Sequence, residues 1–364
     1  MDVKRLGIVG TGLIGASTGL AAKRAGVERV SGYDVNPETT EAARARGAID
    51  DPCTMLDELL DADLVVVATP VLSLERRLTE IIEGDWECTL TDVGSTKVKL
   101  CESIQDPRFV GGHPVTGSEA QGPEHAVADL FDGATWFLTP TAKTDPARYR
   151  LVHSFVSSLG AMPVAIDPDA HDRLVAITSH LPHALANLLV NQAGAGRVEG
   201  HEPLAAAGGS LLDMTRVAGA NPNIWIEIFL ENAGPVRESL AEYRRRIDQL
   251  DAALGSGDAG FLARWIGEAS VNRSRMLAEA YPDAGDLQQL RVHVPDRPGV
   301  LAGITQALGA ERINIEDFEL HHVSPDRGGT LTLLVGGEEQ AQRAAGLLEA
   351  QGYGVVISPV LPSQ

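Results

Sequence analysis

The first part of the chain alternates short apolar runs with helical patterns. Leu64–Ala68 is apolar at every position, as expected of a strand that is buried on both faces of a sheet. After Gly15, apolar residues recur three and four positions apart, which indicates a helix. Further strands are expected at 6–9, 29–34, 89–93, 109–114, 136–138 and 162–166. Residues 1–166 are therefore predicted to form an α/β domain, a Rossmann-type doubly wound sheet with functional loops at the carboxyl ends of its strands.

From residue 167 to residue 283 the strand patterns stop. Long helices are expected at 170–195, 203–219, 223–250 and 258–280. Leu185–Val190 is apolar beyond a single stripe, and a helix that is apolar on all sides is buried. The region is therefore predicted to be an all-helical dimerisation domain, which covers its apolar surface in a homodimer.

The pattern changes again after a linker at 281–286 that contains proline and glycine. Strand patterns then occur at 287–294, 312–322, 329–335 and 354–358, and helical patterns at 298–310 and 338–351. The order β-α-β-β-α-β predicts that residues 287–364 form a ferredoxin-like α+β domain.

The amino-acid composition limits the kinds of molecule that the protein is expected to bind. The 364 residues include 30 basic and 50 acidic ones, which gives a formal net charge of −20. Such a chain lacks a general basic surface for nucleic acid, and an anionic substrate must be held by local positive groups. No apolar run approaches the length of a membrane span, and the three cysteines match neither a metal site nor a disulfide framework. Because a nucleotide-binding strand starts the chain, with no signal peptide before it, a cytoplasmic location is expected, with no nucleic-acid or membrane partner.

A G-x-G-x-x-G motif, Gly10–Gly15, joins the first strand to the first helix. In this context the motif predicts dinucleotide binding rather than an ordinary glycine turn. Gly10 allows the tight turn, Gly12 lets the backbone approach a pyrophosphate, and Gly15 lets the helix pack closely on the strand. Leu13 and Ile14 begin the helix, whose free N–H groups and dipole attract the phosphate charge.

The end of the second strand identifies the dinucleotide. Asp34 lies where an acid accepts hydrogen bonds from the adenosine ribose hydroxyls. Its charge would repel a 2′-phosphate and no arginine follows it directly, so NAD is favoured over NADP. Thr69 and Pro70 follow the strand at 64–68 and are expected near the nicotinamide half of the cofactor.

Unusual polar residues gather at the ends of predicted elements, in Thr91–Lys97, Gly111–Glu119, Ser179–His183 and Asp213–Arg216. Together they contain D-x-G-S-x-K, GGHP, SHLPH and D-M-T-R, and with them nearly the whole chain resembles prephenate dehydrogenase. Val294–Leu301 resembles the start of an ACT domain, a module that binds amino acids and regulates biosynthetic enzymes. The resemblance implies an NAD-dependent oxidative decarboxylation of prephenate to 4-hydroxyphenylpyruvate in tyrosine biosynthesis.

The reaction needs an acceptor for the proton of the ring hydroxyl. His113 is expected in a glycine-rich turn at a strand end, and a neutral imidazole accepts a hydrogen bond at neutral pH. The family places its catalytic histidine here; the alternative is a histidine that caps a turn. Activity is expected to fall in acid as His113 protonates. Ser95 matches the serine that orients the histidine or the hydroxyl, although it could equally be a helix N-cap.

The reaction also needs anchors for two carboxylates. A guanidinium binds a carboxylate through two parallel hydrogen bonds, and the family's counterpart of Arg216 holds the ring carboxylate. Asp213, one helical turn earlier, could hold that side chain in place, or the two could form an ordinary surface pair. Some relatives carry a basic residue where this chain has Leu212, so one positive contact is missing.

Several further positions are assigned by resemblance. The family uses the position of His183 at the substrate side chain, whereas His180 is expected to be structural; no metal is expected. Ser118 and Glu119 match positions that contact the substrate or the tyrosine product, or they form an ordinary loop pair. Lys97 is given no role.

The resemblance implies that the third region binds an effector, tyrosine, unless it serves only in dimerisation. The candidate effector residues are Asp296, Pro298, Gly299, Val300, Leu301 and Asn314. Two other functions remain open: the same chemistry on arogenate, and a non-catalytic sensor of NAD and an amino acid. A β-hydroxyacid dehydrogenase is disfavoured, because those enzymes use a lysine of the helical region and no lysine follows Lys143.

Overall fold

The computed structural model describes residues 2–84, 86–116, 120–280, 286–324 and 328–360. The chain divides into two compact units, Met1–Arg244 and Arg245–Gln364. The division falls inside one long helix, and the expected three-domain boundaries at 1–166, 167–283 and 287–364 stay a prediction.

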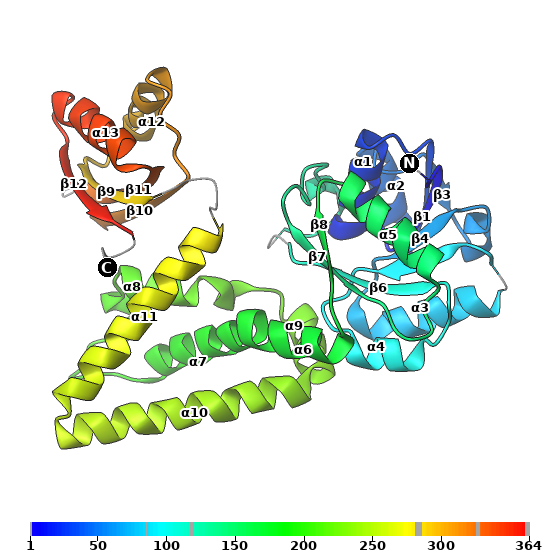
Figure 1. Ribbon diagram of the computed structural model, residues 1–364, viewed down its shortest axis with the longest axis horizontal. Helices are drawn as coiled ribbons and strands as arrows, with labels where there is room; N and C mark the ends of the chain where they lie inside the picture. Colours follow the sequence, from blue (N-terminus) through cyan, green and yellow to red (C-terminus); the bar gives the residue numbers. More distant parts are fainter. Residues whose placement is uncertain (1, 85, 117–119, 281–285, 325–327, 361–364) are drawn as a thin grey trace. The chain divides into compact units, whose positions relative to one another are not determined.

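The first unit is built on a sheet with the strand order β3-β2-β1-β4-β5-β6-β7-β8 (Figure 1). Its strands are β1 (Arg5–Val9), β2 (Arg29–Tyr33), β3 (Asp51–Cys53), β4 (Leu64–Val67), β5 (Thr89–Asp92), β6 (Phe109–Pro114), β7 (Thr135–Thr139) and β8 (Met162–Ala165). Strands β1 to β6 pair in parallel, but β7 pairs antiparallel with β6. A parallel neighbour needs a long crossover, whereas the described residues between β6 and β7 contain only the 3₁₀ helix Pro123–His125.

Helices cover both faces of this sheet, as a doubly wound fold requires. Along β4, Leu64 and Val66 face one apolar core and Val65 and Val67 face the other, because successive strand residues point to opposite sides. The helices of the first core are α1 (Leu13–Arg24), α2 (Pro37–Ala45) and α5 (Pro146–Ser158), and those of the second are α3 (Val71–Glu83) and α4 (Val98–Ser103). This arrangement confirms the predicted Rossmann-type sheet.

The helical region of the first unit begins after β8. Its helices are α6 (Pro168–Val175), a π-helical turn (Ala176–His180), α7 (Leu181–Ala195), a 3₁₀ helix (Pro203–Ala206), α8 (Gly209–Thr215), a 3₁₀ helix (Arg216–Gly219), α9 (Pro222–Glu231) and α10 (Ala233–Ser256). The expected single helix at 223–250 is wrong, since α9 ends before Asn232. The Asn232 side chain is buried and engaged in long-range hydrogen bonds, so this residue joins two helices instead of continuing one.

A π-helical turn separates α6 from α7. The N–H of Leu181 donates to the carbonyl of Ala176, five residues earlier. Pro182 follows directly and has no N–H to donate. A proline inside a helix removes one regular hydrogen bond and crowds the preceding turn, so the wider turn sits where the regular ladder is interrupted.

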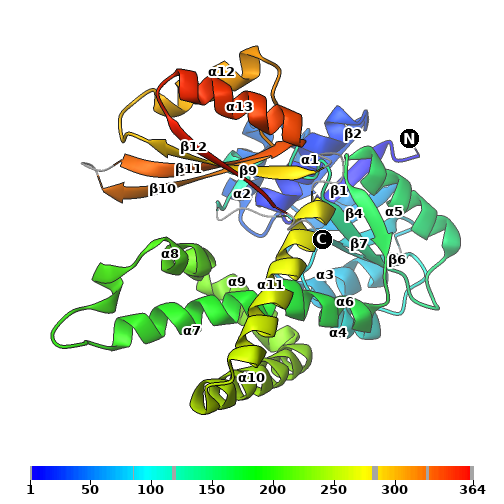
Figure 2. The same cartoon turned by 60° about the vertical axis from the view of Figure 1, so that its left-hand side comes forward.

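The second unit contains the end of α10, helix α11 (Ala259–Ala280) and a separate antiparallel sheet with the order β10-β11-β9-β12. Its elements follow as β9 (Leu287–Val294), α12 (Val300–Ala310), β10 (Asp317–Ser324), β11 (Gly328–Gly336), α13 (Glu338–Ala350) and β12 (Gly354–Pro359). Figure 2 shows α12 and α13 on the same face of this sheet, where they share one apolar core with it. The predicted ferredoxin-like unit is confirmed. No helix in the described part of the chain is long and apolar enough to cross a membrane.

Candidate functional site

The glycine motif forms a tight passage from β1 into α1. Gly10 has a φ of +94°, and a Cβ there would lie 2.5 Å from the Ala68 carbonyl oxygen. A Cβ on Gly15 would lie 1.9 Å from the Gly10 carbonyl oxygen, so only glycine allows the helix to approach. At Gly12 an added Cβ would meet nothing within 4 Å, which leaves the backbone open to a ligand. The three glycines therefore have the geometry expected of a pyrophosphate cradle.

Asp34 lies directly beside this cradle at the end of β2. One carboxylate oxygen accepts the N–H of Thr11 at 2.9 Å and the other accepts the N–H of Asn36 at 3.0 Å. Each oxygen keeps a lone pair for a further donor, such as a ribose hydroxyl. The buried hydroxyls of Thr11 and Thr69 have no hydrogen-bond partner among the described residues. Exposed backbone, an available carboxylate and unpaired hydroxyls fit NAD.

His113 lies within β6, next to the end of β5. The pair Gly111-Gly112 belongs to the strand, so the expected glycine-rich turn is wrong. A Cβ on Gly112 would lie 2.5 Å from the Asp92 carbonyl oxygen, and one on Gly111 would lie 2.3 Å from the Thr139 hydroxyl. The glycines thus let β6 lie close to Asp92 and Thr139. This close packing fixes the position of the His113 backbone, which follows directly in the strand.

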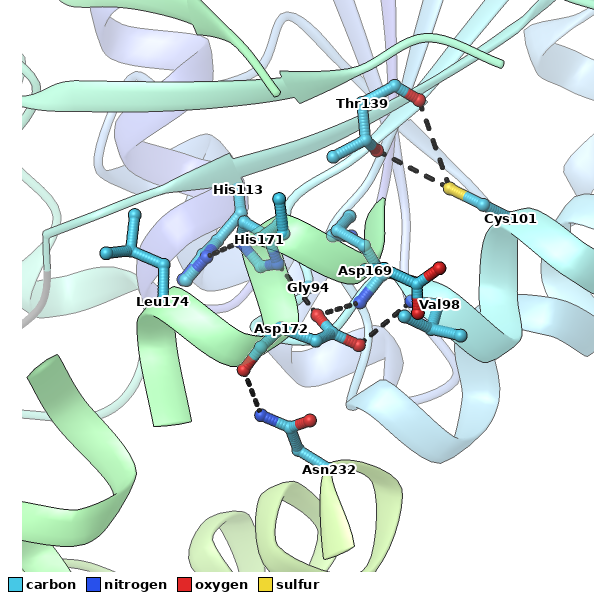
Figure 3. Close-up of polar contacts among 12 residues, drawn as sticks. Gly94, Val98, Cys101, His113, Thr139, Asp169, His171, Asp172, Leu174 and Asn232 are labelled. Carbon is cyan, nitrogen blue, oxygen red and sulfur yellow. Dashed lines mark hydrogen bonds and ion pairs between the residues drawn. The ribbon is translucent and has the colours of Figure 1, made fainter. Parts of the chain in front are cut away.

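A chain of hydrogen bonds links the imidazole of His113 to α6, as Figure 3 shows. Its Nδ1 lies 2.8 Å from Nε2 of His171, and Nδ1 of His171 lies 2.7 Å from Oδ1 of Asp172. His171 is fully buried and Asp172 is 2% exposed, whereas His113 is half-buried. The half-buried ring is therefore held from behind by two buried groups of the helical region.

The carboxylate of Asp172 also binds the loop after β5. Its Oδ1 accepts the N–H of Lys97 at 2.8 Å, and its Oδ2 accepts the N–H of Val98 at 2.9 Å. Asn232 donates its side-chain N–H to the Asp172 carbonyl at 2.8 Å and lies 3.0 Å from Nδ1 of His180. Asp172 thus joins β5, α6 and the α9–α10 junction around one site.

A buried ion pair lies beneath the same loop. The ammonium of Lys97 contacts Oδ2 of Asp92, and both side chains are 0% exposed. The carboxylate of Asp92 also accepts the N–H of Gly94 at 2.7 Å and the N–H of Gly112 at 3.0 Å. The pair therefore ties the loop to both β5 and β6.

The surroundings of His113 keep its imidazole neutral. Burial, reinforced by the nearby His171, Lys97 and His180, lowers the pKa of His113 well below its ordinary value of 6.5. The loss of activity in acid that an ordinary histidine pKa predicts is therefore displaced to lower pH. The ring remains a hydrogen-bond acceptor across the neutral range, as a proton acceptor must.

His180 ends the π-helical turn that follows α6, and His183 lies in the first turn of α7. His180 is 1% exposed, and burial lowers its pKa to about 4. His183 is 5% exposed and stacks on Trp225, with ring centroids 3.4 Å apart and planes 6° apart. Burial lowers the pKa of His183 as well. No group of three or more His, Cys, Asp or Glu side chains within the described ranges is placed to hold a metal ion.

The structure does not bring all the expected site residues together. Ser95 is half-buried, and no hydrogen bond joins it to His113 among the described contacts, where His171 takes that place. It is not the N-cap of α4, because Lys97 is. Arg216 lies exposed just after α8, and its N–H donates to the carbonyl of Asp213, which is also exposed. Ser118 and Glu119 lie outside the described residues.

A separate cavity lies in the second unit. Its volume is about 360 Å³, and the expected effector residues Asp296, Pro298, Gly299, Val300 and Leu301 line it. Leu320 and Gly329 also line it. Asn314 does not belong to this lining and instead donates to Glu316 at 2.8 Å.

Four of the residues that build the site were given no role from the sequence: Asp92 and Lys97, although they begin and end the D-x-G-S-x-K motif, and His171 and Asp172. A usable signal for two of them was helical spacing. His171 and Asp172 precede the buried Val175 and Ala176 by four positions, so they continue the buried stripe of α6. A charged residue on such a stripe must find a partner inside the protein.

Family comparisons cover most of the chain. Residues 18–165 match the prephenate dehydrogenase nucleotide-binding domain, and residues 167–268 match the prephenate dehydrogenase dimerization domain. Residues 288–352 match the ACT domain.

Individual relatives agree with these matches. The prephenate dehydrogenase of Bacillus subtilis is 32% identical over 355 residues, which cover 94% of this chain and 95% of that protein. The crystal structure of prephenate dehydrogenase from A. aeolicus, in complex with hydroxyphenyl propionate and NAD⁺, is 30% identical with a TM-score of 0.72; the match covers 76% of this chain and 99% of that one. Synechocystis arogenate dehydrogenase is 31% identical with a TM-score of 0.67, over 75% of this chain and 99% of that one.

Proposed function

The chain belongs to the prephenate dehydrogenase family, and from this membership we propose that it catalyses the NAD-dependent oxidative decarboxylation of prephenate to 4-hydroxyphenylpyruvate. The protein is an enzyme, and NAD is its cofactor. The reaction belongs to tyrosine biosynthesis, and we place it in the cytoplasm.

The first unit supplies the groups that hold the cofactor. The backbone around Gly12 faces the pyrophosphate, Asp34 takes the adenosine ribose, and Thr69 and Pro70 border the nicotinamide half. NAD⁺, when bound, supplies the hydride acceptor. The remaining steps depend on the side chains of this protein.

His113 accepts the proton of the ring hydroxyl as that hydroxyl becomes a carbonyl. The loss of CO₂ then sends the electrons of the departing carboxylate toward the new carbonyl, the ring becomes aromatic, and the oxygen takes back the proton that His113 accepted. A pKa held below the ordinary range keeps His113 in the accepting form at neutral pH. The half-buried His113 ring, held by His171, is the observation that carries this proposal.

The remaining site residues take binding roles in the proposal. Arg216 binds the ring carboxylate through a charged, two-point hydrogen bond, with Asp213 steadying its side chain. His183 meets the side chain of the substrate, and Ser95 meets the ring hydroxyl. Ser118 and Glu119 are proposed as further substrate contacts.

The test is NADH formation by purified protein with NAD⁺ and either prephenate or arogenate, followed by absorbance. Turnover of prephenate supports the proposal. Turnover of arogenate alone keeps the mechanism but changes the substrate, an alternative favoured by the similarity to an arogenate dehydrogenase. NAD⁺ binding without turnover of either compound would overturn the proposal in favour of a non-catalytic sensor.

We also propose that the enzyme is a homodimer formed through its helical region. That region matches a dimerization domain and carries large apolar side chains that the single chain leaves exposed. They include Leu188, Leu212, Met214, Ile226 and Leu230, each at least half exposed. Sedimentation at micromolar concentration should show a dimer, and a monomer would contradict this proposal.

The ACT domain is proposed to bind tyrosine as a regulatory ligand. The cavity beside the N-terminus of α12 has the volume for an amino acid, and Asp296 offers a carboxylate to an ammonium group. Calorimetric titration should show heat with tyrosine. If no aromatic amino acid gives heat, the domain keeps only a structural role.

A further inference from the structure

We infer that Asp172, acting through His171, determines which ring nitrogen of His113 carries the proton. The inference rests on the proposed function of His113 as the proton acceptor. It assigns Asp172 and His171 as positioning residues that hold the acceptor nitrogen of His113 free for the substrate.

The polarity of the hydrogen-bond chain starts at the carboxylate. An ionised carboxylate can only accept hydrogen bonds. Both oxygens of Asp172 already accept backbone N–H groups, from Lys97 and Val98. The contact of 2.7 Å between Oδ1 and His171 therefore requires a proton on Nδ1 of His171.

When His171 is neutral, the next contact has only one polarity. A neutral imidazole with its proton on Nδ1 can only accept at Nε2. Nε2 of His171 lies 2.8 Å from Nδ1 of His113, so His113 must carry its proton on Nδ1. Nε2 of His113 is left with a free lone pair, and this is the atom that accepts the proton of the substrate hydroxyl.

Packing holds the middle ring in place independently of these hydrogen bonds. Phe137 pairs with His113 across β6 and β7 and meets the His171 ring edge-on, with centroids 5.4 Å apart and planes at 80°. The rings of His113 and His171 cross at 76°. Because the His171 ring is held in place between Asp172 and His113, the direction of its hydrogen bond to Asp172 determines the direction of its hydrogen bond to His113.

The same carboxylate also sets the backbone of the loop that carries Ser95. It binds two successive N–H groups of that loop from α6, a different part of the first unit. One side chain thus positions His113 and the Ser95 loop together. Loss of its charge should disturb catalysis more than cofactor binding, because the glycine cradle does not contact it.

The decisive variant is Asp172→Asn. An amide can donate a hydrogen bond to Nδ1 of His171, and His171 then carries its proton on Nε2. Nε2 of His171 donates to Nδ1 of His113, so the proton of His113 moves to its own Nε2. That is the atom that must accept the proton of the substrate hydroxyl. The corresponding acid-to-amide change in a serine-protease triad lowers kcat about 10⁴-fold by favouring the wrong tautomer. For Asp172→Asn we expect kcat to fall about 10²–10⁴-fold while NAD⁺ affinity, measured by fluorescence titration, stays within about threefold.

A matched pair of variants at His171 separates positioning from folding. In His171→Gln the amide oxygen can still accept from Nδ1 of His113, whereas His171→Leu offers no acceptor. We expect His171→Gln to retain a kcat at least about tenfold higher than that of His171→Leu, at equal thermal stability. Equal kcat values in these two variants, or a wild-type kcat in Asp172→Asn, would overturn the inference.

The tautomer can also be read without any turnover. Nitrogen-15 NMR of the histidine-labelled full-length protein, with signals assigned from His113→Asn and His171→Gln, should show the ring proton of His113 on Nδ1. A ring proton on Nε2 would overturn the inference even if the enzyme is active. Inactivity of the wild-type protein on prephenate and arogenate would instead count against the proposed function, and the NMR result would still decide the tautomer.

Discussion

Replacing Lys97 with methionine tests the role of the buried ion pair. The variant removes the ammonium from beside the fully buried Asp92, whose carboxylate keeps the N–H groups of Gly94 and Gly112 as its hydrogen-bond donors in the described part of the chain. Breaking a buried pair by removing one partner typically costs about 3–5 kcal/mol, and the two N–H groups place this case near the lower end. A loss of about 3 kcal/mol in a unit of this size lowers Tm by about 6–12 °C.

Calorimetry is the suitable assay, because the chain has two units and the shift belongs to the transition of the unit that contains β5. Lys4→Met is the matched control, since Lys4 pairs with Glu28 at 3.6 Å with side chains 68% and 66% exposed. An exposed pair contributes at most about 1 kcal/mol, so this control should change Tm by no more than about 4 °C. A Lys97→Met protein as stable as the Lys4→Met protein would refute the reasoning.

Three further predictions follow from the site. His113→Asn should lower kcat about 10²–10⁴-fold with little change in NAD⁺ affinity, and near-normal kinetics would remove His113 from its role. Arg216→Gln should mainly raise KM for prephenate, by about 10- to 100-fold through a lost charged hydrogen bond of about 1.5–3 kcal/mol; an unchanged KM would contradict the anchor. The pKa of His180 is about 4 in the folded protein and about 6.5 when unfolded, so the unfolded state binds a proton first as pH falls, and stability should drop by about 2 kcal/mol between pH 7 and pH 5. Urea unfolding should show a smaller drop in His180→Asn, and an equal drop in both proteins would exclude this residue as the cause.

Apolar patterns predicted most of the fold because burial repeats with the period of each element. The strand at 64–68 was visible since both of its faces are buried, and the βαββαβ order needed only the sequence of patterns. The antiparallel direction of β7 was not visible, because direction depends on the connection between strands and not on the pattern within one. The break at Asn232 was missed because its cause is a hydrogen bond to Asp172, 60 residues away.

The part of the candidate site that is formed by residues close together in the sequence was predictable. The glycines and Asp34 belong to one βαβ unit, so their spacing in sequence fixes their spacing in the structure. His171 lies 58 residues from His113 in the chain, and no local rule pairs them. The contact between His113 and His171, and through His171 to the buried Asp172, becomes visible only in the folded structure.

The π-helical turn between α6 and α7 sets the angular phase of the histidines that follow it. In a regular α-helix, nine residues separate His171 from His180 by about 900°, which places them on opposite sides. A π turn adds one residue without adding its share of rotation, about 100°, so both side chains can face the same interior. Deletion of one exposed residue from this turn, such as Thr178, would leave a regular helix in which eight residues separate the two histidines by about 800°, so His180 and His183 would keep their side relative to His171. The turn therefore holds one residue more than the phase of these histidines requires.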